Sequence, residues 1–247
     1  MRRRVPISLA AVLGLVLLQP AVGNAATGYT LQFSKFGTTY VLDRWNPCQR
    51  DIVYRVNAWL AAGTYVGRQA AIADVIAAVD LVHEATGINF RYAGTTPYIP
   101  TGPNWANSTT SGGEPAEIVI AWTDARHPST LLAGGAAGTG GFALRARTIT
   151  GGTLLGNIGR GFVLLNAAQN RYFKPGFGGG VTRGELLLHE IGHAMGLGHT
   201  GLRTQIMYPV MISRTTTRYG SYDLAGLARL GRKAGCVNIP GLWQDLS

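Results

Sequence analysis

Long apolar runs and acidic residues are both scarce in this chain of 247 residues. The main apolar run, residues 7–18, covers 12 residues, whereas a helix that spans a bilayer needs roughly 20. Acidic residues number 12 against 22 basic ones, but the basic residues are scattered and form no aromatic-interleaved patch of the kind that binds nucleic acid. The sequence also has no internal repeat. These absences argue against an integral membrane protein, a solenoid and a nucleic-acid-binding module.

The first 25 residues differ from the rest of the chain. Arg2, Arg3 and Arg4 precede the apolar run, and small residues follow it up to Ala25. This is the layout of a cleaved export signal. We therefore predict a signal peptide at 1–25, cleaved near Ala25, and a secreted, extracellular protein that keeps no membrane anchor. The export route stays open. The arginines resemble those of a twin-arginine signal, but the rest of that pattern is missing. Residues 26–247 are predicted to form a single catalytic domain with a formal charge of 19 − 12 = +7.

Cysteine occurs only twice, at Cys48 and Cys236. Both lie in the predicted mature chain, and two remote cysteines in an oxidising compartment more often pair than stay free. We expect one disulfide, which would close nearly the whole mature chain. Two free thiols are the alternative.

The hydrophobic pattern predicts both strands and helices. Alternation of apolar and polar residues indicates a strand at 51–57, and a period near 3.6 indicates an amphipathic helix at 69–84, with Gly87 just past its end. A closing helix is expected at 223–229, capped by Ser221 or Asp223. Further strands are predicted at 88–92, 117–122, 142–148 and 161–166.

The chemistry is concentrated in residues 189–199, which read His-Glu-Ile-Gly-His-Ala-Met-Gly-Leu-Gly-His. A capping box at 182–185 predicts a helix start just upstream. On that helix His189 and His193 lie four residues apart, so both imidazoles share one face and can bind one metal ion. Gly196 permits a left-handed turn that returns His199 to the metal. Three imidazoles leave the fourth zinc position open for water, which is typical of a catalytic site.

Glu190 follows the first histidine and points about 100° away from it around the helix. It is therefore placed to reach the metal-bound water rather than the metal, as a general base does. The simpler alternatives are a buried helix that merely contains histidines and a zinc site kept only for folding. The presence of Glu190 beside the first ligand argues against both.

The motif resembles that of the metzincins, and within them the matrixins, the family of the matrix metalloproteases. The second element of the resemblance is Gln-Ile-Met-Tyr-Pro at 205–209, with Met207 eight residues beyond His199. Similarity extends over most of residues 45–232. The resemblance implies an α+β fold: a twisted mixed sheet of about five strands with an amphipathic helix and an active-site helix packed on it, and a C-terminal helix after the methionine turn. It also implies that Met207 packs beneath the metal and that Asp223 supports the turn.

The same resemblance implies how a substrate would lie. Residues 186–189 and 209–211 would border the pocket for the residue after the scissile bond. The glycine-rich edge at 141–144 would pair with an extended substrate by strand addition.

The chain departs from animal matrixins, which carry a second, structural zinc ion and calcium ions. The segment between the third strand and the active-site helix offers only Asp124 and His127 as ligands, too few for a closed tetrahedral site. We therefore expect one catalytic zinc ion, and neither calcium nor structural zinc. His127 is interpreted as a loop histidine and His83 as a residue at the solvent edge of its helix.

Together these features predict a secreted, monomeric, zinc-dependent endopeptidase that hydrolyses peptide bonds with zinc-activated water and Glu190 as general base. Its partner would be a protein or peptide substrate, with no nucleic acid. Two alternatives stay open: a secreted peptide-binding or cell-surface protein that keeps the zinc without turnover, and a zinc amidase that acts on cell-wall peptides.

Overall fold

The computed structural model describes residues 28–36, 39–103, 105–107, 116–149 and 152–237. The predicted signal peptide at 1–25 lies outside these residues. The helices are α1 (Tyr65–Thr86), α2 (Arg183–Met195) and α3 (Ser221–Leu230), with short 3-10 turns η1 (Trp105–Asn107), η2 (Ala167–Tyr172) and η3 (Arg232–Ala234). The strands are β1 (Thr30–Leu31), β2 (Phe33–Phe36), β3 (Thr39–Leu42), β4 (Ile52–Asn57), β5 (Phe90–Thr95), β6 (Ile118–Thr123), β7 (Gly138–Ile149), β8 (Gly152–Asn166) and β9 (Leu197–Gly198).

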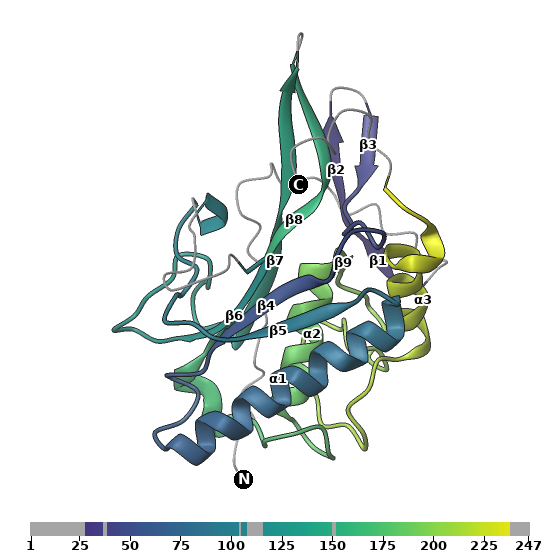
Figure 1. Ribbon diagram of the computed structural model, residues 1–247. Helices are drawn as coiled ribbons and strands as arrows, with labels where there is room; N and C mark the ends of the chain where they lie inside the picture. Colours follow the sequence, from purple (N-terminus) through teal and green to yellow (C-terminus); the bar gives the residue numbers. More distant parts are fainter. Residues whose placement is uncertain (1–27, 37–38, 104, 108–115, 150–151, 238–247) are drawn as a thin grey trace.

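The centre of the fold is a five-stranded sheet in the order β5-β4-β6-β8-β7. Four strands run parallel, and β7 pairs antiparallel with β8 at one edge (Figure 1). Every residue of the middle strand β6 is buried, because both faces of the sheet are covered. Helices α1 and α2 pack on one face and build the larger core, whereas Trp105 and Leu131 pack on the other. The predicted mixed sheet with two helices and a closing C-terminal helix is confirmed.

Several predicted elements are longer in the structure. Helix α1 begins at Tyr65, four residues before the predicted start, because the Thr64 hydroxyl caps it by accepting a hydrogen bond from the amide of Gly67 at 3.1 Å. It ends as predicted at Gly87, in a left-handed conformation with φ of 68°. The strands predicted at 142–148 and 161–166 are parts of one long β7–β8 hairpin. Its glycines do not end the strands, because cross-strand pairing holds the backbone extended.

The predicted cap of the closing helix is wrong. The N-cap of α3 is Gly220, not Ser221 or Asp223. Asp223 is instead the third residue of the helix, and its carboxylate accepts a hydrogen bond from the Gly220 amide at 3.0 Å. In the described part of the chain, no helix is both long and apolar enough to cross a bilayer.

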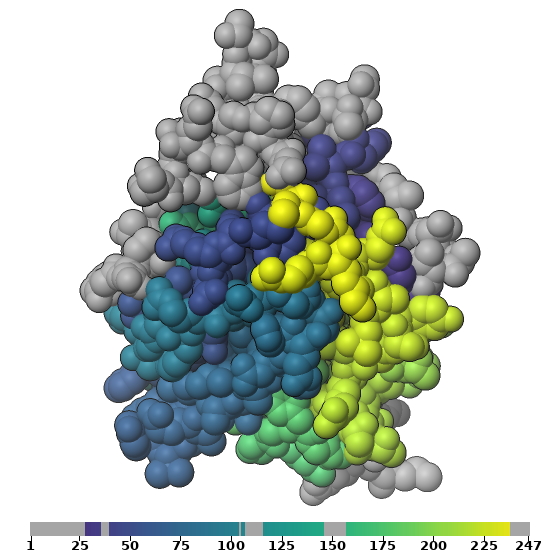
Figure 2. All heavy atoms as spheres, turned by 45° about the vertical axis from the view of Figure 1, so that its right-hand side comes forward, coloured from purple at the N-terminus to yellow at the C-terminus, as the bar shows by residue number. Residues whose placement is uncertain are grey.

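The predicted disulfide between Cys48 and Cys236 is confirmed. The guanidinium of Arg44 donates hydrogen bonds to the carbonyls of residues 234–236 beside it, and the Asn46 side chain bonds both backbone groups of Val237. Figure 2 shows the result: the C-terminal helix and the segment after it, in yellow, lie against the purple and blue N-terminal part of the chain. The two ends of the described chain are thus joined covalently and by hydrogen bonds.

Removal of this disulfide should destabilise the fold strongly. The two cysteines are separated by 188 residues, and by loop entropy a link over such a distance stabilises a fold by up to about 5 kcal/mol. We expect the Cys48→Ala/Cys236→Ala variant to unfold at lower urea concentration than the oxidised protein, and reductant to leave the variant unaffected. Equal midpoints for the variant and the oxidised protein would show that the link adds nothing to stability.

Candidate metal centre

Helix α2 carries the first two predicted ligands and is buried along its whole length. It begins after Thr182, whose hydroxyl accepts a hydrogen bond from the Glu185 amide at 3.1 Å. The predicted capping box is only half formed, because the Glu185 carboxylate turns to Arg214 instead of back to the cap. The helix ends at Gly196 with φ of 108°. A side chain there would be strained by this conformation and would collide with the carbonyl oxygen of Asp43.

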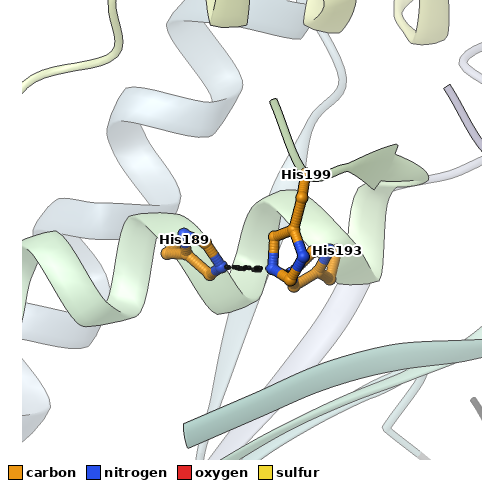
Figure 3. A group of neighbouring side chains, drawn as sticks. All are labelled: His189, His193 and His199. Carbon is orange, nitrogen blue, oxygen red and sulfur yellow. Dashed lines mark hydrogen bonds between the residues drawn. The ribbon is translucent and has the colours of Figure 1, made fainter. Parts of the chain in front are cut away.

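The three predicted histidines converge on one point. His189 and His193 project from one face of α2, and His199 approaches from the loop after β9 (Figure 3). Their Nε2 atoms lie 3.1–3.2 Å from one another. Nitrogen ligands at about 2.0–2.1 Å from a tetrahedral zinc ion are about 3.3 Å apart. The donor set therefore fits a zinc ion in both chemistry and spacing.

The other ring nitrogens fix the protonation of two ligands. Nδ1 of His189 lies 2.7 Å from the Ile206 carbonyl oxygen, and Nδ1 of His193 lies 2.8 Å from that of Leu197. A carbonyl oxygen only accepts hydrogen bonds, so Nδ1 carries the proton and Nε2 keeps its lone pair. Burial lowers the pKa of His189 to about 3 and the pKa of His193 well below its usual value. Both rings are held neutral, as metal ligation requires.

The Glu190 side chain projects from α2 towards the edge strand β7 and is fully buried. Burial raises the pKa of its carboxyl group, and the backbone amide of Gly140 opposes this by stabilising the charged form. Its Oε1 atom has no hydrogen-bond partner among the described residues. A buried carboxylate oxygen without a partner is costly, and here it belongs to the residue predicted as the general base.

Two glycines of β7 allow this close approach of helix and strand. A side chain at Gly138 would come within 2.9 Å of Oε1 of Glu190, and one at Gly140 would overlap the Glu190 carbonyl oxygen. Both glycines lie on the same face of the strand, because side chains alternate with a period of two. These two glycines were not predicted, because the hydrophobic pattern indicates a strand only from Phe142.

The methionine turn lies beneath the histidines. Met207 is buried, and its sulfur packs on α2 at Gly192, where an added Cβ atom would approach Sδ to 2.5 Å. The carboxylate of Asp223 accepts hydrogen bonds from the backbone amides of Ile206 at 2.6 Å and Met207 at 3.3 Å. Asp223 thus joins helix α3 to the turn, at the position that the sequence predicted for it.

A buried ion pair also connects the segment at the methionine turn to α2. It was not predicted from the sequence. Nε of Arg214 lies 2.7 Å from Oε1 of Glu185 on α2, and the two side chains are 10% and 1% exposed. The guanidinium also donates to the carbonyls of Arg203 and Gln205, just before the methionine turn. No sequence pattern links Arg214 to Glu185, because they are 29 residues apart and pair only through the fold.

The N-terminal segment holds the loop of the third ligand. Strand β1 pairs with β9, immediately before His199. The Gln32 backbone amide donates to the Gly196 carbonyl at 2.9 Å, and its side-chain amide donates to the Leu197 carbonyl at 2.8 Å. The Thr200 hydroxyl donates to the Gly28 carbonyl on the far side of the histidine. No pattern in the sequence predicts this role for residues 28–32.

Loss of this N-terminal pairing should weaken metal retention. A variant without residues 26–32 should bind zinc about 10 to 100 times more weakly, the usual cost of losing groups that orient metal ligands, and should therefore release zinc faster to a chromophoric chelator. Gln32→Ala should change the rate in the same direction by a smaller factor. Lys35→Ala, an exposed position three residues further on, is the matched control. Release rates equal to that of the control would contradict the proposed support of His199.

The two remaining histidines lie away from this centre. Nδ1 of His83 contacts the Ile88 carbonyl, and His127 is exposed and paired with Asp124 at 3.0 Å. Within the described segments, the three ligand histidines form the one group of three or more metal-binding side chains. That calcium and structural zinc are not needed stays a prediction, as do the substrate contacts at 141–144, 186–189 and 209–211.

Comparison with known proteins agrees with this geometry. A sequence model of the matrixin family matches residues 107–230, half of the chain, from the segment before β6 through helix α3. A search among curated proteins finds no match. The matched region contains all three histidines, Glu190 and the methionine turn. The chain therefore belongs to the matrixin family of zinc metalloendopeptidases.

Proposed function

We propose that the protein is a secreted, single-domain endopeptidase that uses one zinc ion and Glu190 as general base. Two features carry the proposal. The Nε2 atoms of three imidazoles converge, and Glu190, next to His189 in the chain, is fully buried with one carboxylate oxygen that has no partner among the described residues. A carboxyl group next to a metal ligand can take a proton from water, which turnover requires and simple binding does not.

The residues divide the chemical work as follows. His189, His193 and His199 would hold the zinc ion, which when bound supplies polarisation of the peptide carbonyl and acidification of water. Oε1 of Glu190 accepts a proton from the attacking water while a bond forms between the water oxygen and the peptide carbon. The same carboxyl group then gives this proton to the leaving nitrogen as the C–N bond breaks. The amide of Gly140 keeps the carboxyl group able to return to its charged form.

The substrate would be a protein or peptide in extended conformation. Strand β7 is the edge of the sheet next to Glu190, so its outer side is where a substrate strand can be added. The disulfide supports an extracellular location, because disulfides persist in oxidising compartments.

The proposal is tested by incubating the zinc-loaded protein with denatured casein, with a peptide library and with peptidoglycan, and by identifying the products by mass spectrometry. We expect internal cleavage of casein and of the library peptides. Cleavage of peptidoglycan cross-links alone would support the cell-wall amidase instead. If zinc-loaded protein bound peptides without cleaving any substrate, the peptide-binding alternative would replace the proposal.

A further inference from the structure

Two adjoining hollows run along one end of the five-stranded sheet, outside the metal centre. One, of about 590 Å³, lies between the first turns of α1 and the ends of β4 and β5. The other, of about 490 Å³, continues past the end of β6 to Ala167 and Ala168 after β8. The hollows share Trp59, Leu60 and Arg68. We call the two together the sheet-end groove; it lies where β4 and β8 end and α1 begins. The start of α1 is at the lower left of Figure 1.

Two large aromatic side chains are exposed in the sheet-end groove. Trp59 is 67% exposed and Tyr65 is 69% exposed, and both line the groove. The guanidinium of Arg68 stacks over the Trp59 ring, 4.7 Å from its centroid. Clustered exposed apolar area of this kind marks interaction sites, and Trp, Tyr and Arg are the side chains that contribute most to binding energy at interfaces.

The loop that carries Trp59 is held in place before any partner arrives. The Trp59 amide donates to the Asn57 side chain at 3.1 Å. The Asn170 side chain donates to the carbonyls of Leu60 and Ala61 and accepts a hydrogen bond from the Trp122 indole. A fixed aromatic surface binds with less loss of conformational entropy than a mobile one.

The charge of the groove favours an anionic partner. Arg68 and Arg126 line it, and the carboxylate there, Asp124, already accepts hydrogen bonds from the backbone amides of Arg126 and His127 and contacts the His127 ring. The two arginines and the one aspartate give the groove a formal net charge of 2 − 1 = +1. An occupant with a carboxylate next to aromatic or aliphatic side chains would match both the charge and the apolar surface.

The groove lies at the end of the sheet where strand β7 begins, close to Glu190. Gly138, which contacts Glu190, begins β7 and pairs with Leu165 of β8. A chain laid along β7 leaves the sheet at this end, beside Ala167 and Ala168. A substrate strand added outside β7 lies four spacings of about 4.8 Å from β4, so about six extended residues at about 3.3 Å each span the distance to Trp59.

We propose that the sheet-end groove is a second substrate-binding site, which takes an apolar segment with a carboxylate located at least about six residues from the scissile bond of a protein substrate. This inference rests on the proposed endopeptidase function and specifies its substrate class. It implies that long substrates with such a segment are cleaved more efficiently than short peptides with the same scissile bond.

The test uses three synthetic peptides built around one cleaved bond that has been identified by mass spectrometry. One peptide has six residues, and two have 20 residues with a Glu-Trp-Leu segment six residues before or after the bond. For Trp59→Ala and Arg68→Glu, kcat/KM for at least one long peptide should fall about tenfold, mainly through KM, while the value for the short peptide stays unchanged. Tyr40→Ala and Lys233→Glu, which are exposed and outside the groove, are the matched controls.

Binding is measured separately with the Glu190→Gln variant, so that the result does not depend on turnover. Trp59→Ala in that background should weaken binding of the responsive long peptide about tenfold. Equal losses for short and long peptides, or no loss with either long peptide, would overturn the inference but leave the peptidase function intact. Tighter binding of neutral oligosaccharides than of the acidic peptides would also overturn it. Absence of cleavage together with groove-dependent peptide binding would instead count against the proposed function.

Discussion

Replacement of Glu190 by glutamine should lower kcat/KM by about 10³-fold, within the range expected when a general base is removed. The amide has nearly the same shape as the carboxyl group, so the packing of α2 against Gly138 and Gly140 should persist. It cannot accept a proton from water, because its oxygen is far less basic than a carboxylate. The measurement is steady-state cleavage of a fluorogenic peptide, with zinc content determined on the same samples.

The matched control is Glu84→Gln, an exposed glutamate on α1, which should retain full activity. The variant at Glu190 should still bind one zinc ion per molecule, since the three ligands are unchanged. Activity within a few-fold of the wild type at equal zinc content would mean that another group takes the proton.

The second large effect is expected on stability, from Asp223→Ala. The carboxylate accepts hydrogen bonds from the amides of Ile206, Met207 and Gly220, and its replacement leaves three donors without that acceptor. Each unsatisfied buried donor costs about 1 to 3 kcal/mol. The amides of Ile206 and Met207 are buried and that of Gly220 is partly buried, so the free energy of unfolding should fall by at least about 2 kcal/mol in urea titrations of the zinc-loaded protein. Because the turn carries Met207 and the Ile206 carbonyl that orients His189, zinc release should also become faster.

Two further variants sharpen this result. Asp223→Asn keeps one acceptor oxygen and should lose less stability than Asp223→Ala. Asp51→Ala, an exposed aspartate before β4, should lose almost none. An Asp223→Ala variant as stable as Asp51→Ala would show that the hydrogen bonds to the turn do not support it.

The parts of the site that depend on local spacing could be predicted from the sequence. His189, His193 and Glu190 share one helix, so a helical period of 3.6 residues places them. Gly196 and His199 come directly after this helix in the sequence, so a single left-handed turn places the third ligand. The disulfide could be predicted because the chain has only two cysteines. The roles of Met207 and Asp223 were implied by resemblance to the matrixins. In the structure, Asp223 accepts hydrogen bonds from the turn, and Met207 packs on α2 at Gly192.

The parts that depend on contacts between distant segments could not be predicted. Arg214 reaches Glu185 only because the loop after the methionine turn folds back onto α2. Residues 28–32 look featureless in the sequence, yet they pair with the loop of His199 because the chain end returns to α2. The β7–β8 hairpin was divided into two short strands because its glycines resemble turn signals, whereas antiparallel pairing outweighs their local preference.

The central claim is that one zinc ion at the three histidines, with Glu190 beside it, is sufficient for peptide hydrolysis. The most direct measurement is a titration of metal-free protein with zinc in calcium-free buffer, with peptide cleavage followed at each addition. We predict that activity rises linearly to one zinc ion per molecule and then stays constant. A requirement for a second equivalent of zinc or for calcium, or no cleavage at full zinc occupancy, would contradict the claim.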